Sequence, residues 1–157
     1  MLFRSVRSMK RHARLQELSR EHHGALKLAR DAKHAAASGE AAEMEKLARH
    51  VVDIFRAELE PHFRIEEGGV LVFLAQAGEH LPVQRTLDEH RELRQLAAAL
   101  QQPDGPTLLR FGELMAAHVR FEERELFETA QARLDGAGLD TFAAVEKIGR
   151  ASCRERV

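Results

Sequence analysis

The chain has 157 residues and a formal net charge of -1, with 44% hydrophobic residues, 31% charged residues, nine histidines and a single cysteine. This composition predicts one domain with a packed core, and one cysteine excludes a disulfide framework and cysteine-based zinc or iron–sulfur sites. The near-neutral charge favours neither nucleic acid nor an anionic membrane as a partner, and without a long apolar segment we expect a soluble, cytoplasmic protein.

Glycine and proline divide the sequence into four long expected helices. The first covers residues 20–38, with Ser19 as its N-cap, and ends at Gly39. The second covers residues 40–67 and carries apolar residues at helical spacing. Because Pro61 lies inside this second helix and has no N–H, we expect a kink at Pro61 rather than a helix end.

The second half of the chain contains a short apolar stretch and two more helices. Residues 70–77 predict a short buried turn or helical extension. The third helix begins after Pro82 and ends before the loop at residues 101–106, and the fourth covers residues 107–134. Short connections force neighbouring helices to be antiparallel, and no segment alternates with period two. We therefore predict an all-α, up-down-up-down four-helix bundle with a metal site in its core.

The two ends are assigned separately from the bundle. We expect residues 1–18 to form an N-terminal arm, residues 19–135 the bundle, and residues 136–147 a C-terminal segment or short helix. Residues 148–157 read like the in-frame translation of a sequencing-library adapter, so we expect them to be a non-native tail and exclude them from the fold.

Each expected helix turns one histidine toward the bundle axis, as the phase of that histidine with the apolar residues indicates. Two of these histidines have a glutamate four residues later, which places imidazole and carboxylate on one inward face. Buried glutamate is costly unless it is paired or bound to a metal. The residues predicted to form a metal site are His22, His62, Glu66, His90, His118 and Glu122.

Four neutral imidazoles and two carboxylates suit a pair of first-row metal ions. Each ion is held by two histidines, the carboxylates bridge, and positions stay open for water or a small ligand. Iron and manganese are the natural candidates, and zinc is an alternative.

His23 is the alternative to His22, because adjacent residues lie about 100° apart around a helix. Candidates to orient an imidazole from outside are Glu21, Glu58 and Glu125. The histidines expected on polar faces or in loops are His12, His34, His50 and His80.

Two His-x-x-x-Glu motifs separated by a lone histidine occur in order within residues 62–67, 88–93 and 118–123, after Glu-His-His at residues 21–23. This pattern resembles the hemerythrin-like proteins, also called HHE cation-binding domains, over residues 19–134. The resemblance implies a four-helix bundle around a non-heme di-iron centre. It assigns one iron to His22 and His62, the other to His90 and His118, and the bridging positions to Glu66 and Glu122.

The resemblance also indicates what kind of function to expect. Oxygen-carrying members have a fifth histidine where this chain has Arg94. That departure disfavours reversible oxygen transport and favours metal binding, sensing of iron or oxygen, or reaction with peroxide or nitric oxide.

Three functional hypotheses follow. The first is a di-iron protein that binds or senses oxygen, a related small ligand or iron. The second is a di-iron enzyme acting on peroxide or nitric oxide. A ferritin-like version is disfavoured because those sites use Glu-x-x-His, and no histidine here has a glutamate three residues before it. The third is a metal-free helical interaction module. No catalytic residue and no particular protein partner is predicted, and whether the protein is an enzyme stays open.

Overall fold

The computed structural model describes residues 11–137, which form helices and no strand. The predicted tail at residues 148–157 and residues 138–147 of the predicted C-terminal segment lie outside the described residues, as do residues 1–10 of the predicted arm. Among the described helices, none combines the length and the apolar character needed to cross a membrane.

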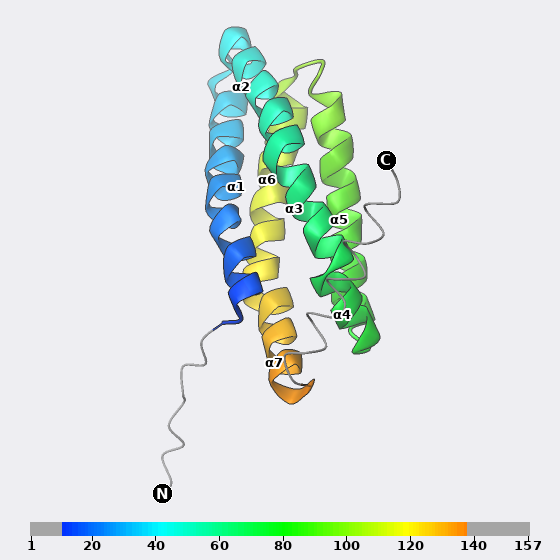
Figure 1. The fold of residues 1–157 in the computed structure, drawn as a ribbon. Helices are drawn as coiled ribbons and strands as arrows, with labels where there is room; N and C mark the ends of the chain where they lie inside the picture. Colours follow the sequence, from blue (N-terminus) through cyan, green and yellow to red (C-terminus); the bar gives the residue numbers. More distant parts are fainter. Residues whose placement is uncertain (1–10, 138–157) are drawn as a thin grey trace, which may run out of the picture.

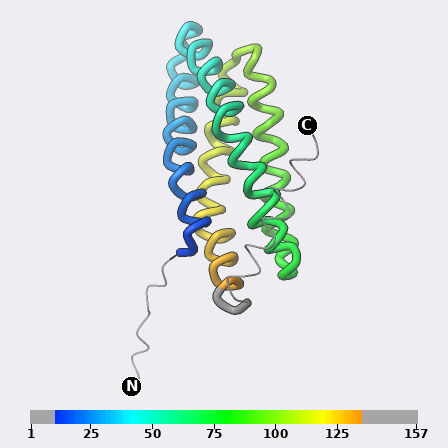
Figure 2. The backbone as a smooth tube through the Cα atoms, viewed as in Figure 1, coloured from blue at the N-terminus to red at the C-terminus, as the bar shows by residue number. Residues whose placement is uncertain are grey.

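The described helices form four rods that lie side by side (Figure 1). The first rod is α1 (Ala13–Ser38). The second consists of α2 (Ala41–Ile54), the π-helical turn η1 (Phe55–Leu59) and α3 (Glu60–Gly68). After the short helix α4 (Val70–Gln76), the third rod is α5 (His80–Ala99). The fourth consists of α6 (Gly105–Phe121), the π-helical turn η2 (Glu122–Leu126) and α7 (Phe127–Ala137). The smooth trace in Figure 2 shows the second and fourth rods as continuous.

The first rod is longer than predicted at its N-terminal end. It begins at Ala13 with His12 as its N-cap, ahead of the predicted start after Ser19. Leu15 and Leu18 are buried in this added stretch, and packing of an apolar face supplies most of the stability of a helix in a protein. Part of the expected N-terminal arm therefore belongs to the bundle.

The other helix ends fall close to their predicted places. Gly39 ends α1 with a φ of 71°, in the left-handed region that favours glycine. The third rod starts at His80, so that Pro82 lies in its first turn, where its missing N–H has no intrahelical partner to lose. The fourth rod continues past the predicted end at Leu134 to Ala137.

The second and fourth rods each contain a π-helical turn. In η1 the backbone N–H of Glu60 donates to the carbonyl of Phe55, five residues earlier. This turn ends two residues before Pro61. The helix continues past the proline, as predicted, and the irregularity next to it is a π turn within a continuous rod. In η2 the N–H of Phe127 donates to the carbonyl of Glu122 in the same way. The turn η1 lies shortly before His62, and η2 begins at Glu122.

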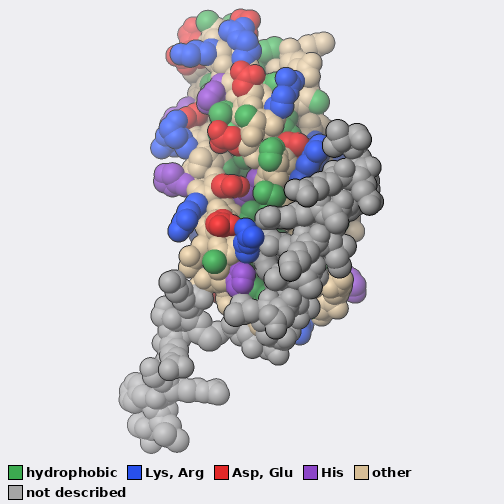
Figure 3. All heavy atoms as spheres, in the orientation of Figure 1, with side chains coloured by type: hydrophobic (Ala, Val, Ile, Leu, Met, Phe, Trp, Pro, Cys, Tyr) green, Lys and Arg blue, Asp and Glu red, His purple; other side chains and the backbone are tan. Residues whose placement is uncertain are grey.

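Within the described residues, two apolar clusters fill the bundle, and the predicted site residues lie between them along the rods. One cluster joins α1, the second rod, α5 and α6 around Leu28, Val51 and Phe111. The other joins the start of α1 to α4 and α7 through residues such as Leu15 and Phe127. On the outside, acidic and basic side chains are interspersed over the visible face (Figure 3).

Candidate metal centre

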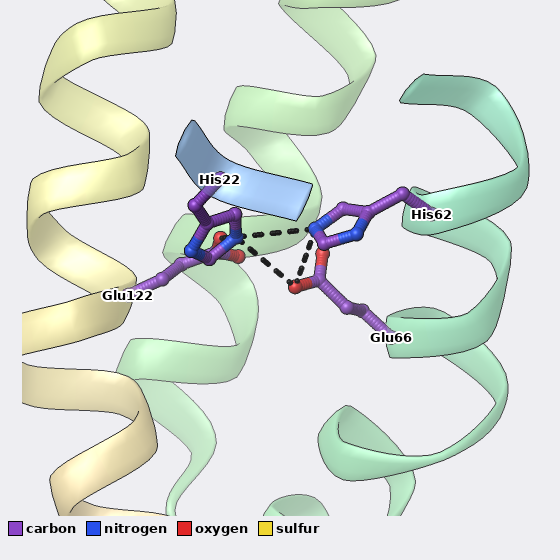
Figure 4. Close-up of side chains that lie close together, drawn as sticks. All are labelled: His22, His62, Glu66 and Glu122. Carbon is purple, nitrogen blue, oxygen red and sulfur yellow. Dashed lines mark hydrogen bonds and ion pairs between the residues drawn. The ribbon is translucent and has the colours of Figure 1, made fainter. Parts of the chain in front are cut away.

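The six predicted site residues converge in the middle of the bundle. They come from all four rods, and each is at most 4% exposed. Figure 4 shows four of them, from α1, α3 and the fourth rod, pointing toward one another. His22 is buried whereas its neighbour His23 is exposed, so His22 is the residue of that pair that reaches the centre. The exposed histidines away from the centre include His34, His50 and His80.

The ligand atoms form two overlapping groups that share both carboxylates. One group contains His22 and His62, the other contains His90 and His118, and within each group the atoms lie within 4.8 Å of one another. Glu66 Oε1 lies 3.1 Å from His62 Nε2, and Glu66 Oε2 lies 3.2 Å from His90 Nε2. Each oxygen of Glu66 therefore belongs to a different group.

The two oxygens of Glu122 also belong to different groups. Its Oε2 lies 3.1 Å from His22 Nε2 and its Oε1 lies 3.3 Å from His118 Nε2. Two imidazole nitrogens and two shared carboxylates thus lie around each of two adjacent positions. Ligand atoms about 2.1 Å from a first-row metal ion and at right angles to each other lie about 3 Å apart, which is the spacing found here.

The lack of hydrogen-bond partners for several of these atoms also supports a metal site. In the described part of the chain, the buried side-chain atoms without a hydrogen-bond partner are both oxygens of Glu66 and Glu122 and the Nε2 atoms of His90 and His118. Unpartnered buried polar atoms are rare and costly. Coordination of cations at these positions would give all of these atoms a partner, so the residues fit a metal site.

Comparison with known families decides the class of the protein. The family model of the hemerythrin HHE cation binding domain matches residues 13–130. The chain belongs to the hemerythrin HHE cation-binding domain family. Comparisons with curated proteins and with solved structures gave no significant match. As a hemerythrin domain the protein binds metal cations, and its buried histidines and glutamates supply groups that fit this role.

In this hemerythrin domain, each of the four imidazoles is also held at its outer nitrogen, Nδ1, by one further glutamate. A carboxylate only accepts, so Nδ1–H donates in each pair and Nε2 is left free to face the centre. Each hydrogen bond joins one rod to the next, and together they close a ring around the bundle. The pairs, 2.5–2.9 Å apart, are His62–Glu21, His90–Glu67, His118–Glu89 and His22–Glu123.

Of these outer glutamates, Glu21 alone was predicted from the sequence. The other two candidates, Glu58 and Glu125, are exposed. The signal that finds all four is adjacency: each outer glutamate is the sequence neighbour of an inward residue, as Glu67 is of Glu66. Adjacent residues of a helix lie about 100° apart, so one faces the centre while its neighbour faces the next rod.

Arg94, at which the sequence departs from the resemblance, is bound by two glutamates. Its Nε lies 2.7 Å from Glu60 Oε2, and its Nη1 lies 2.8 Å from Glu67 Oε1. Although burial opposes the charge, these bonds raise the pKa of Arg94 above its ordinary value. Because Glu67 holds His90, Arg94 contacts the centre indirectly, through that glutamate.

The carboxylates make this cluster strongly cation-attracting. Burial lowers the pKa of an imidazole, but hydrogen bonds to Glu122 and Glu123 raise the pKa of His22 to about 10. Burial raises the pKa of the Glu66 carboxyl, but His62 and other imidazoles hold it well below its usual range. Protons and metal ions therefore compete for the same nitrogens, and metal binding releases protons.

A pocket of about 340 Å³ connects the centre with the surface between α1, the second rod and α6. His22, His62 and His118 form its inner wall, and the exposed Ile65 and Glu21 lie among its other lining residues. The rest of the wall is mostly apolar. A small, weakly polar molecule can therefore reach the histidine side of the centre through this pocket.

Proposed function

We propose that this hemerythrin domain, with the up-down-up-down topology expected for it, is a non-heme di-iron protein. One iron is held by His22 and His62 and the other by His90 and His118, while Glu66 and Glu122 bridge the two. The observation that supports this most directly is the division of each carboxylate, with one oxygen directed to each histidine pair.

Iron is the favoured metal because mixed imidazole and carboxylate ligands with open positions suit first-row ions, with manganese and zinc as alternatives. When bound, iron supplies redox-active coordination of a small ligand. The surrounding residues have two roles. The outer glutamates orient the imidazoles, and the apolar pocket wall limits the entry of water. Since Arg94 is engaged by Glu60 and Glu67, each position has two histidines and open sites.

The ligand that this arrangement favours is oxygen or a related small molecule, or iron itself as the sensed species. The pocket wall carries apolar side chains such as Leu59, Met115 and Val119 close to the three histidines. Such a wall suits a diatomic ligand better than a charged metabolite. The proposal includes neither nucleic acid nor a membrane as a partner.

Metal analysis of the purified full chain tests the proposal. Protein expressed in iron-replete medium is expected to carry two irons per chain and to show the near-ultraviolet absorption of an oxo bridge. Protein that contains no iron, manganese or zinc under these conditions would falsify it.

A di-iron enzyme acting on peroxide or nitric oxide is the second candidate, favoured by the open positions that Arg94 leaves. Consumption of hydrogen peroxide by the iron-loaded protein distinguishes this enzyme from a binding or sensing protein. Turnover at a catalytic rate identifies an enzyme, whereas stoichiometric reaction identifies a binding or sensing protein.

A further inference from the structure

The outer glutamates differ in what holds them in place. Three of them bind an arginine as well as a histidine. Arg11 Nη1 lies 2.6 Å from Glu123 Oε2, Arg94 Nη1 lies 2.8 Å from Glu67 Oε1, and Arg85 Nε lies 2.8 Å from Glu89 Oε1.

These arginines are themselves fixed by other contacts. The guanidinium of Arg85 lies 3.8 Å from the ring centroid of Phe121, and that of Arg94 also binds Glu60. Arg11 binds Glu128 in addition to Glu123. Each of the three carboxylates is therefore held by a histidine and by an arginine that has another anchor, which restricts its movement.

Glu21 is the exception. Its side chain is 56% exposed, compared with 14% for Glu89 and 30% for Glu123. In residues 11–137 no arginine or lysine forms an ion pair with Glu21, and its hydrogen-bond partner is His62. It also lines the pocket that leads from the surface to the centre.

The two metal positions differ in how many of their outer glutamates also bind an arginine. His90 and His118 are both held by glutamates that carry an arginine. Of the other pair, His22 is held in this way and His62 is not. His22 and His62 both line the pocket, whereas of the other pair His118 lines it and His90 does not.

We propose that the two cation positions are unequal, and that Glu21 is the positioning residue that makes them so. The His90–His118 position holds its cation tightly. The His22–His62 position exchanges its cation through the pocket, because His62 turns away once water replaces Glu21 at its Nδ1. This inference rests on the proposed binding of two cations.

The physical reason lies in what an imidazole must break before it can leave a metal. Outer carboxylates fix the orientation of the ring, and removing one typically costs ten- to hundredfold in metal affinity. An exposed carboxylate exchanges its partner for water at little cost, whereas a carboxylate held by an anchored arginine does not. His62 is therefore the ligand that dissociates first.

The experiment uses the full chain loaded with Co²⁺ and then mixed with excess chelator, and it follows the release of Co²⁺ by absorbance. The wild-type protein is expected to release one equivalent quickly and one at least about tenfold more slowly. Glu21→Gln should accelerate the fast phase alone. Arg85→Gln, which frees Glu89, should accelerate the slow phase alone.

Arg49→Gln serves as the control, because Arg49 pairs with Glu45 on the surface and its loss should change neither phase. His62→Ala, with folding verified by circular dichroism, should abolish the fast phase and keep one slowly released Co²⁺. Release of both equivalents in a single phase, or acceleration of the slow phase by Glu21→Gln, overturns the inequality. Uptake of fewer than two Co²⁺ per wild-type chain instead contradicts the di-metal proposal itself.

Discussion

The second and fourth rods differ from the first and third in both ligands and backbone. Each of the former carries a histidine and a glutamate four residues apart and contains a π-helical turn, whereas α1 and α5 each carry one inward histidine and are regular. The spacing of buried residues explains the difference. Along α5 the buried positions Thr86, His90, Leu93 and Ala97 alternate in steps of four and three.

In the fourth rod one series of buried residues, which begins at His118, proceeds in steps of four. His118, Glu122, Leu126, Ala130 and Leu134 are all at most 1% exposed. Four residues of a regular α-helix turn by about 400°, so each step drifts by about 40° and four steps by about 160°. The wider π turn accommodates one more residue than an α-helical turn, so it offsets much of this drift and helps to keep the series facing inward. A helix that supplies two ligands at this spacing, followed by a buried stripe, thus requires an irregular backbone.

The largest expected effect is on iron content, and it depends on whether a ligand is shared by both positions or belongs to one. Glu122→Ala removes a group shared by both positions, so the iron content should fall from two per chain to nearly none. His90→Ala removes a ligand of one position and should leave about one iron per chain. Metal analysis of both purified variants measures the contrast. A Glu122→Ala protein that keeps its full metal content would refute the site assignment.

A smaller effect is expected where the fourth rod packs against the first. A Cβ added at Gly112 would lie 2.6 Å from the carbonyl oxygen of Ala29 and 2.7 Å from Lys33 Cγ. Gly112→Ala should therefore lower the free energy of unfolding by about 1–3 kcal/mol, although alanine favours the helix. Gly24→Ala in α1 is the matched control, because nothing lies within 4 Å of its Cβ.

Urea unfolding at fixed metal loading measures both glycine variants. Gly24→Ala should raise the free energy of unfolding by up to about 1 kcal/mol through helix propensity. If Gly112→Ala stabilises the protein to the same extent, the two rods do not depend on the small side chain at this contact.

Much of the site was predictable because it depends on local periodicity. The inward phase of His62 and His118, and the glutamates four residues later, follow from the helical repeat alone. The early start of α1 was missed because Leu15 belongs to a cluster that includes Phe127, far along the chain. Most of the outer glutamates were missed for the same reason, since Glu67 acts on a histidine of the next rod.

The π turns were missed although the spacing that requires them is visible in the sequence. The apolar residues Val51, Phe55, Leu59 and Phe63 follow one another in steps of four, and all four are buried. The missing N–H of Pro61 instead predicted a kink at that residue. This leaves a physical question, whether the proline or the buried spacing produces η1.

Pro61→Ala answers that question and is expected to have the smallest effect. The turn η2 is a π turn within Glu122–Leu126, a segment that contains no proline, so proline is not required for such a turn. Alanine restores a backbone N–H, but a return to regular α-helix would rotate the buried residues on one side of η1 away from the core. We therefore expect the π turn to persist, the free energy of unfolding to change by less than about 1 kcal/mol, and both irons to remain.

The control for this variant is Pro82→Ala, where proline lies in the first turn of α5, away from the ligands. Urea unfolding and metal analysis should give nearly unchanged values for both variants. If Pro61→Ala loses about one iron while Pro82→Ala keeps two, the proline itself sets the register of His62. The two irregular rods would then differ in origin, with η1 imposed by the missing N–H of Pro61 and η2 by the buried series that begins at His118.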